Sequence, residues 1–295
     1  MIFVAGLAAC TTAPRQSSGP PEFSDSPWTT DFFTTADPAV PVTVAILDPA
    51  PAHTRLSLAG LFGAGRSPAG ASSRALSLGT TPWRHSISGR RPVGVVVSSG
   101  EMKAAPVPPY WAVVLRENGS WEMVPQAKLE REIADDPGTT GEPTAFHPAE
   151  LLLAAGGFYP LIIDGAAVAG AFPGTTIRAP RVAIGGRAGT TGTTGTTGTT
   201  GRSGTASGPA GTTARIVVVA TGPGDGGGLT TEELAQLLLS YDLDWALNLD
   251  GGRSAYLRFP DGHIRPKGIR FRRPGPVQLH FVPPDGVALP QEMVQ

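Results

Sequence analysis

The stretch Trp245-Ala-Leu-Asn-Leu-Asp-Gly-Gly-Arg-Ser254 decides both the fold and the candidate site of this chain. Residues 245–249 are mainly apolar and are bounded by polar and glycine residues, a pattern that predicts a short β-strand. Because side chains alternate along a strand, we expect Asn248 and Asp250 to share one face and the two leucines the other. An amide and a carboxylate therefore stand where a structural strand would carry aliphatic groups.

The residues after this strand turn the chain. Gly251 and Gly252 permit a sharp turn or a close approach of the backbone to a ligand. Ser254 then returns a hydroxyl group to the same neighbourhood. A polar strand end beside a Gly-Gly turn is typical of a binding or catalytic site. The alternative is an ordinary Asp-Gly turn, in which the Asn and Asp side chains bond to their own backbone.

A short helix is predicted before this strand, over residues 230–240. Thr230 and Glu233 have the spacing of a capping box, and leucines at helical spacing give the helix one apolar face. Glu233 is therefore either a capping partner, which is the commoner role, or a catalytic carboxylate. The glycine-rich run 222–228 and the helix N-terminus offer backbone N–H donors to an anion.

Strands dominate the rest of the chain. Asn118-Gly119 between two apolar runs is a strong hairpin signal. Two further short helices are predicted over residues 126–133 and 149–155. Because helices and strands do not alternate regularly, the sequence predicts an α+β fold, a single domain with a mixed, largely antiparallel β-sheet and a few short helices. Apolar, β-branched runs predict strands at residues 42–47, 92–98, 110–115, 121–124, 158–163, 181–184, 215–220 and 277–282.

The composition excludes several classes of function. The 295 residues carry a formal net charge of −1 and no basic block interleaved with aromatic residues, so nucleic acid is not an expected partner. No apolar run reaches the length of a transmembrane helix. The five histidines are scattered, and the run 222–228 lacks the Lys-Ser/Thr pair of a nucleotide-binding loop. We therefore expect neither a metal nor a cofactor.

The single cysteine, Cys10, ends a short apolar N-terminal run. Leu7-Ala8-Ala9-Cys10 resembles a bacterial lipobox, in which the cysteine is lipidated and becomes the first residue of the mature protein. This resemblance implies a lipid-anchored protein of the bacterial cell envelope, periplasmic or extracellular, that meets the membrane only through its lipid. No Lys or Arg precedes Cys10, so the alternative is an ordinary N-terminus with a buried free cysteine.

Composition also marks the expected boundaries along the chain. Residues 11–41 are rich in Ser, Thr and Pro and predict a flexible linker. Gly-Thr-Thr repeats mark residues 187–213 as a low-complexity insertion, because they carry no apolar side chains to offset the entropy of ordering. The chain thus divides into a lipoprotein signal segment (1–10), the linker (11–41), the folded domain (42–283) and a tail (284–295).

Two segments together resemble the signature of the phosphodiester glycosidase family, which includes the uncovering enzyme. They are Gly228-Leu-Thr-Thr-Glu-Glu-Leu-Ala235 and Ala246-Leu-Asn-Leu-Asp-Gly-Gly-Arg-Ser254. Pro180-Arg181-Val-Ala-Ile-Gly185 is similar to a strand of the same family. The resemblance covers residues 42–283 and implies a hydrolase that acts on glycosyl phosphodiester bonds.

The chain differs from the family pattern in three places. Arg253 stands at the third glycine of the motif, and Val182 replaces a threonine. The early Asn-(Gly/Ala)-apolar-Phe motif corresponds to Ala59-Gly-Leu-Phe62, which has no asparagine. These differences bear on the substrate and on the activity.

The resemblance and the residue types together predict the chemistry of the site. Asp250 is the expected carboxylate, which stabilises positive charge at an anomeric carbon or activates water. Asn248 is expected to orient the substrate or that water. Arg181 offers the forked donors that match phosphate oxygens, with a surface carboxylate as its alternative partner.

Further contacts with a glycan or sugar-phosphate substrate are expected around these three residues. Ser254 is more simply a turn hydroxyl than a nucleophile, because no Ser-His-Asp arrangement is marked. The competing hypotheses are a non-catalytic surface lipoprotein that binds glycan or serves exopolysaccharide assembly, and a structural β-rich module. Convergence of the three polar side chains on one open pocket would favour the enzyme. The additional candidates are Thr230, Gly251, Gly252 and Ser254 for binding, and Glu233 for catalysis.

Overall fold

A computed structural model describes residues 28–47, 54–58, 75–86, 89–134, 151–187, 215–260, 262–267 and 277–282. Several predicted features lie outside these described residues: Cys10, residues 59–62 of the early motif, the insertion beyond residue 187, and the tail 284–295.

The largest sheet has seven strands in the order β1-β2-β15-β14-β16-β12-β13, and neighbouring strands are antiparallel. The strand β16 carries the polar end and lies inside the sheet, between β14 and β12. The candidate site is thus held by hydrogen-bonded neighbours on both sides. The bounds are β1 Trp28–Thr34, β2 Pro41–Leu47, β12 Pro160–Ile163, β13 Ala166–Ala167, β14 Arg181–Gly186, β15 Ile216–Thr221 and β16 Trp245–Gly251.

The edge strand β1 lies where the composition predicts linker. It pairs with β2 along its whole length, from Trp28 opposite Leu47 to Thr34 opposite Pro41. The linker prediction is therefore wrong for this part of residues 11–41. The segment is rich in threonine and phenylalanine, which fit a pleated, half-buried surface, and pairing with β2 decides its conformation.

Two five-stranded sheets and a two-stranded ribbon complete the described fold. One five-stranded sheet has the order β10-β9-β11-β7-β8, and the other has the order β18-β17-β4-β19-β3. Every strand pair that the structure describes is antiparallel, so the parallel part of the expected mixed sheet is not found among them. The bounds are β3 Thr54–Leu58, β4 Leu76–Gly79, β5 Trp83–Ser86, β6 Gly89–Pro92, β7 Val96–Ser98, β8 Glu101–Ala104, β9 Trp111–Arg116, β10 Trp121–Pro125, β11 Leu151–Gly156, β17 Leu257–Arg258, β18 Ile264–Arg265 and β19 Val277–Phe281.

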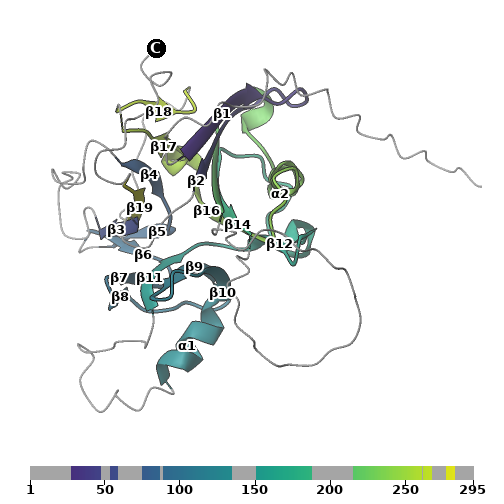
Figure 1. The fold of residues 1–295 in the computed structure, drawn as a ribbon. Coiled ribbons are helices and arrows are strands. Elements are labelled where there is room, and N and C mark those ends of the chain that lie inside the picture. The colour runs from purple at the N-terminus through teal and green to yellow at the C-terminus, as the bar shows by residue number, and fades with distance from the viewer. Residues whose placement is uncertain are drawn as a thin grey trace, which may run out of the picture.

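Figure 1 shows the arrangement of the three larger sheets. Buried residues of all three form one central apolar core. Val182 of β14 and Leu247 of β16 point into it from the seven-stranded sheet. Leu78 of β4 and Val113 of β9 enter it from the two other sheets. Alternate residues of β14 and β16 face the opposite way and pack beneath the helix α2 (Thr231–Leu239).

Two of the three predicted helices are confirmed. The helix α2 covers the outer face of the seven-stranded sheet, and α1 (Gln126–Ala134) packs through Leu129 on the sheet that contains β9. The helix predicted over residues 149–155 is wrong, because β11 runs there as an inner strand between β9 and β7. A short apolar run fits a buried strand as well as a helix, and burial between two neighbours selects the strand.

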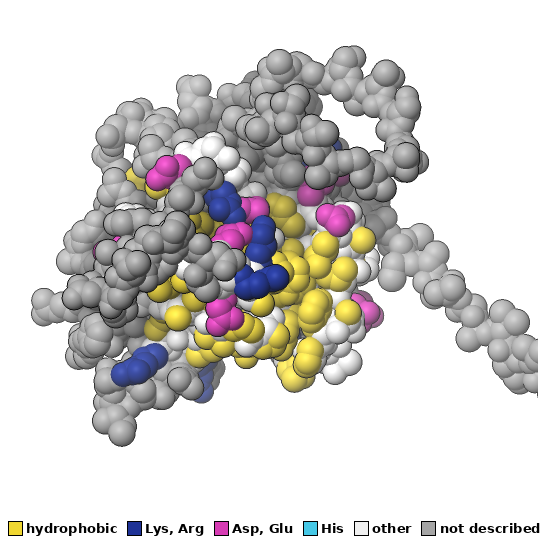
Figure 2. Space-filling view, turned by 90° about the horizontal axis from the view of Figure 1, so that it is seen from below, with side chains coloured by type: hydrophobic (Ala, Val, Ile, Leu, Met, Phe, Trp, Pro, Cys, Tyr) yellow, Lys and Arg dark blue, Asp and Glu magenta, His cyan; other side chains and the backbone are white. Residues whose placement is uncertain are grey.

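Figure 2 shows a face on which hydrophobic side chains adjoin a group of Lys or Arg and Asp or Glu side chains of both signs. No single sign of charge dominates this face, in keeping with the net charge of −1. Within the described ranges, no helix is both long and apolar enough to cross a membrane.

Candidate functional site

The strand β16 carries a bulge at the site. Asn248 lies opposite Ala183 of β14, and Gly251 lies opposite Arg181. Three steps along β16 therefore match two steps along β14, which leaves one extra residue on β16.

The bulge breaks the alternation that the sequence predicts. Leu249 and Asp250 both stand opposite Val182, whose side chain lies in the central core. Asn248 shares the face of Ala183, which packs beneath α2. The prediction that Asn248 and Asp250 share one face is therefore wrong, because an extra residue reverses the order of faces beyond it.

Asp250 is held in a largely buried environment. Its backbone N–H donates to the Thr80 carbonyl at 2.9 Å, and its Oδ1 accepts from the Gly251 N–H at 2.9 Å. Burial raises the pKa of Asp250 to about 6, against smaller opposing effects of hydrogen bonds from Ser254, the Gly251 N–H and Trp83. Its Oδ2 is buried and has no hydrogen-bond partner among the described residues. Asp250 is thus a shielded carboxyl, with Oδ1 fixed by the Gly251 N–H and Oδ2 sealed from solvent.

The contacts with Thr80 and Trp83 are missing from the sequence-based site. Thr80 and Thr81 are fully buried, and Trp83 is half-buried at the start of β5. Because these residues lie far from Asp250 in the sequence, the sequence alone does not show that they contact it. The segment Thr-Thr-Pro-Trp also carries no local signal of a site. Only the packing of β4 beside β17 and β19 brings the segment to the end of β16.

The turn after Asp250 is open on one side. Gly252 has φ +61°, and no described atom lies within 4 Å of the position that a Cβ would occupy. Its N–H donates to the Pro180 carbonyl at 2.8 Å, which fixes the turn to the start of β14. Ser254 is buried, whereas Arg253, which replaces a family glycine, is exposed. The arginine at this position therefore projects away from the protein interior.

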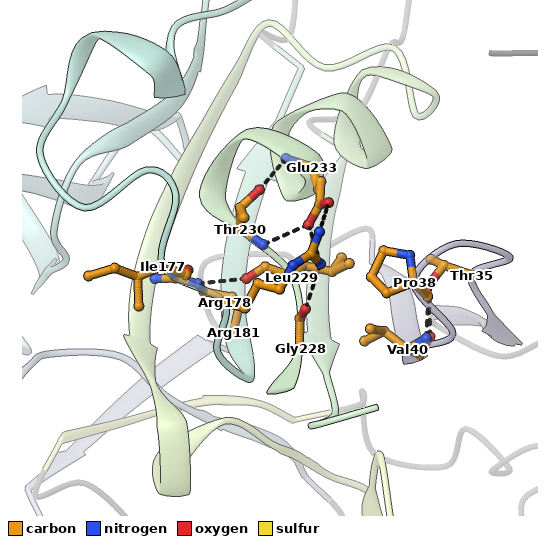
Figure 3. A network of polar contacts seen from close by, with 10 residues as sticks. All are labelled: Thr35, Pro38, Val40, Ile177, Arg178, Arg181, Gly228, Leu229, Thr230 and Glu233. Atoms are coloured by element: carbon orange, nitrogen blue, oxygen red, sulfur yellow. Dashed lines mark hydrogen bonds and ion pairs between the residues drawn. The ribbon is translucent and has the colours of Figure 1, made fainter. Parts of the chain in front are cut away.

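Arg181 is anchored by backbone carbonyls (Figure 3). Its Nε donates to the Leu229 carbonyl at 3.3 Å and its Nη2 to the Ile177 carbonyl at 2.5 Å. Burial lowers the pKa of Arg181 from its usual value, yet a guanidinium stays charged at neutral pH. Among the described residues Arg181 makes no ion pair with a carboxylate, so the surface ion pair considered as its alternative role is not seen there.

Glu233 has a structural role at the start of α2 (Figure 3). Thr230 Oγ1 accepts from the Glu233 N–H at 3.1 Å, and Glu233 Oε2 accepts from the Thr230 N–H at 2.9 Å, which confirms the capping box. Arg178 also binds both oxygens of Glu233. Burial acts to raise the pKa of Glu233, but hydrogen bonds from the Thr230 N–H and from Arg178 lower it overall.

The glycines before α2 are required by close backbone contacts. A Cβ at Gly228 would lie 2.3 Å from the carbonyl carbon of Ala179, and one at Gly224 would lie 2.3 Å from the Ala39 oxygen. Both residues also have positive φ angles, +118° and +41°. Packing against neighbouring segments therefore explains these two glycines without a bound anion.

Asn248 is buried at the centre of this region. Its side chain is 5% exposed, and its Oδ1 has no hydrogen-bond partner among the described residues. Its backbone is tied on the β12 side, where the Phe158 N–H donates to its carbonyl at 2.8 Å and its own N–H donates to the Tyr159 carbonyl at 3.1 Å. This buried amide oxygen therefore keeps hydrogen-bonding capacity for a water molecule or a ligand.

The predicted residues thus meet at one end of the sheet but on two sides of it. Arg181 and Asn248 lie on the α2 side of β14 and β16, and Asp250 lies beyond the bulge on the side of β4. The side-chain-free turn at Gly252 lies between the two sides. The described part of the chain contains no cluster of three or more His, Cys, Asp or Glu side chains that could hold a metal ion.

Solved structures of other proteins share the fold of this chain. The catalytic domain of zebrafish N-acetylglucosamine-1-phosphodiester alpha-N-acetylglucosaminidase, auto-inhibited by its pro-peptide, matches with a TM-score of 0.57 and 13% identity, over 92% of this chain and 86% of that chain. A hypothetical protein from Synechocystis matches with a TM-score of 0.50 and 14% identity, over 86% of this chain and 62% of that chain. At such identities these structures show a shared fold alone. No curated protein matches the chain.

The family assignment rests on a match to the amino-acid sequence itself. A family model described as phosphodiester glycosidase matches residues 83–281, well over half of the chain. This range contains Arg181, Asn248 and Asp250, and it begins at Trp83, which contacts Asp250. The chain therefore belongs to the phosphodiester glycosidase family.

Proposed function

We propose that this protein hydrolyses a glycosyl-1-phosphodiester at the anomeric carbon, with Asp250 as the acting carboxylate. Family membership supports the reaction class. The observation that carries the proposal for this chain is the Asp250 carboxyl, with Oδ1 fixed by Gly251 and a buried Oδ2 that no described residue binds.

The stability of the leaving group determines how much general-acid catalysis the reaction needs. A phosphate monoester departs with the electron pair of the C1–O bond and is stable as an anion, so little protonation of the leaving oxygen is required. The enzyme must instead support the positive charge that develops at C1 or activate the water that attacks it. Asp250 serves either role once it is ionised, and in the second role it accepts the proton that water loses as its oxygen bonds to C1.

Arg181 is suited to the phosphate of this substrate. The carbonyls of Leu229 and Ile177 fix its guanidinium before any ligand binds, which lowers the entropy lost on binding. Its register partner is Gly251, which adjoins Asp250. The substrate would then lie across the turn at Gly252, which has no side chain to obstruct it. In this arrangement the glycosyl group is near Asp250 and the phosphate is near Arg181.

Release of free sugar from a panel of glycosyl-1-phosphodiesters tests the proposal. We expect turnover by the wild type and a loss of at least about a hundredfold in kcat for Asp250→Asn, the scale of removing a group that acts directly in the transition state. Equal turnover by both proteins would remove Asp250 from the mechanism. Absence of turnover by the wild type, together with sugar binding in calorimetry, would favour the non-catalytic glycan-binding protein.

We further propose that the protein works at the bacterial cell envelope through a lipid on Cys10. The lipobox-like run Leu7-Ala8-Ala9-Cys10 supports this location. Metabolic labelling of the full chain with a palmitate analogue in a bacterial host should mark the wild type and not Cys10→Ser. Equal labelling of both proteins, or labelling of neither, would count against the anchor.

A further inference from the structure

Arg253 is an exposed cation beside the candidate site. It lies in the 3-10 helix η4 (Gly252–Ser254), which directly continues the turn. Among the described residues it makes no ion pair or hydrogen bond. The other two arginines of this region are engaged, Arg178 with Glu233 and Arg181 with backbone carbonyls. An exposed arginine is most often a solvated surface charge, so the position of Arg253 decides whether it does more.

The segment that carries Arg253 lies on the Asp250 side of the turn. Ser254, the next residue, is buried, and its side chain forms a hydrogen bond with Asp250. The Ser254 carbonyl oxygen lies 3.5 Å from the position that a Cβ on Gly79 of β4 would occupy, so η4 packs on the end of β4. Arg253 thus flanks the part of the site that contains Asp250, whereas Arg181 lies across the turn on the α2 side.

The charge of Arg253 does not serve the Asp250 carboxylate. Burial raises the pKa of Asp250, and the opposing effects are hydrogen bonds, among them that of the Gly251 N–H, with no contribution from a cation. A guanidinium paired with this carboxylate would lower its pKa further. The positive charge of Arg253 is therefore available to a ligand.

We propose that Arg253 makes the enzyme selective for a glycosyl group that carries a carboxylate, a hexuronosyl group. This inference rests on the proposed function, in which the glycosyl group is near Asp250 and the phosphate is near Arg181. A phosphodiester carries a single negative charge, for which Arg181 supplies one guanidinium. The second guanidinium, on the glycosyl side of the turn, matches a second anion. The forked donors of arginine fit the two oxygens of a carboxylate.

The turn leaves room for this contact. No described atom lies within 4 Å of the position that a Cβ on Gly252 would occupy, so the backbone beside Arg253 is open. Consecutive Cα atoms are about 3.8 Å apart, and the long arginine side chain extends beyond this distance. Its guanidinium is tied to no other described group and can meet a carboxylate at C6 of a sugar whose C1 is near Asp250. A glycine, which the family motif has at position 253, offers no side chain for such a contact.

Two diesters and three variants test this inference. One substrate is the methyl phosphodiester of the neutral hexose that the panel shows to be hydrolysed fastest, and the other is the same diester oxidised at C6 to the uronic acid. kcat/KM is measured for both with the wild type, Arg253→Gln, Arg253→Lys and Arg131→Gln. Glutamine removes the charge and keeps a polar side chain, whereas lysine keeps the charge without the fork. Arg131→Gln, which removes an exposed arginine of α1, is the matched control for net charge.

The measured quantity is the ratio of kcat/KM for the uronosyl diester to kcat/KM for the neutral diester. Because both diesters are compared across variants, differences in their inherent reactivity cancel. We expect Arg253→Gln to lower this ratio by about fivefold, the scale of one partly exposed ion pair, and Arg131→Gln to leave it unchanged. Arg253→Lys should give an intermediate ratio. The effect of Arg253→Gln should shrink at high ionic strength.

An unchanged ratio in Arg253→Gln would overturn the inference, while hydrolysis of the neutral diester by the wild type would still support the proposed function. Equal losses with both diesters would also overturn it and assign Arg253 to the phosphate or to the turn. A wild type that hydrolyses the neutral diester but not the uronosyl diester would exclude the selectivity. Hydrolysis of neither diester by the wild type would overturn the proposed function and this inference with it.

Discussion

Arg178 binds both carboxylate oxygens of Glu233, with Nη1 3.0 Å from Oε2 and Nη2 2.5 Å from Oε1. The same guanidinium donates to the Gly228 carbonyl at 3.2 Å, and Arg181 donates to the next carbonyl, that of Leu229. Two arginines thus fix consecutive residues before α2 (Figure 3). We infer that Arg178 also neutralises a carboxylate that would otherwise repel an anionic substrate near Arg181.

Arg178→Met should therefore raise KM for the diester by about threefold, because it exposes the charge of Glu233 at a half-exposed position where pair energies are below about 1 kcal/mol. The double variant Arg178→Met, Glu233→Gln should return KM to the wild-type value, since glutamine keeps the capping box without the charge. The effect of the single variant should also shrink at high ionic strength. If the double variant were as impaired as the single one, Arg178 would act through loop geometry and not through charge.

The pH dependence of the reaction should report Asp250. Because burial raises the pKa of this carboxyl to about 6 and the ionised form is the active one, kcat/KM should rise with pH up to about 6 and then level off. Trp83→Phe removes a hydrogen bond that lowers this pKa, so its rising limb should move to higher pH. A rising limb near pH 4 in both proteins would show that burial does not raise the pKa of the titrating carboxyl and would contradict the prediction.

The raised pKa of Asp250 also predicts that removal of its charge stabilises the protein. A carboxyl whose pKa is raised on folding binds more protons in the native state between about pH 4 and pH 6, so its contribution to stability falls as pH rises through that window. Asp250→Asn should therefore be more stable than the wild type at pH 7.5, by on the order of 2 kcal/mol, and equal to it below about pH 4. Urea denaturation at several pH values measures this difference. A loss of stability at pH 7.5 would contradict the prediction.

His280 should show the opposite dependence. Its Nδ1 lies 2.7 Å from Ser77 Oγ, and burial, with Arg258, lowers its pKa to about 4. The unfolded chain then binds the proton more readily between about pH 4 and pH 6.5, so this group destabilises the protein as pH falls through that window. His280→Asn, which keeps an acceptor for Ser77, should lose this dependence, by on the order of 2–3 kcal/mol relative to the wild type at pH 4. Parallel pH profiles for the two proteins would exclude His280 as the source.

Substitution of Gln126 tests how much its buried side-chain hydrogen bonds contribute to stability. Its buried Oε1 accepts from the N–H groups of Val95 and Val107 at 2.9 and 2.8 Å, and its Nε2 donates to the Trp111 carbonyl at 3.0 Å. Gln126→Leu leaves the N–H groups of Val95 and Val107 without their acceptor, while the Trp111 carbonyl keeps the Gly157 N–H, and should cost about 2–4 kcal/mol of stability. The exposed Lys128→Leu on the same helix is the control and should change stability by less than about 0.5 kcal/mol. Equal midpoints in urea for the two variants would refute the role of Gln126.

Local patterns predict most elements of this fold. The β9–β10 hairpin, the helix α2 with its capping box, and the strand β16 follow from turn residues, helix caps and apolar periodicity. Two of the errors, at β1 and β11, arise where neighbouring strands decide the conformation of an ambiguous segment. The β11 pairings join residues far apart in the chain, and the β1–β2 pairing overrides a local composition that is typical of a linker.

Some features of the candidate site are likewise visible in the sequence, and others depend on the folded structure. The types and spacing of Asn248 and Asp250 are visible in the sequence, but the bulge that separates them depends on register with β14. The contacts of Asp250 with Trp83 and of Glu233 with Arg178 join segments with no common motif. The alternation of side chains along a strand predicts the face of each residue only where the two paired strands have equal numbers of residues.

The extra residue in β16 determines which face of the sheet carries the Asp250 side chain. Removal of Leu249 would bring β16 back into step with β14 and rotate the carboxyl of residue 250 toward the helix-covered surface, beside the amide. A single-codon deletion would thus change the geometry of the candidate site while Arg181, Asn248 and the aspartate all remained.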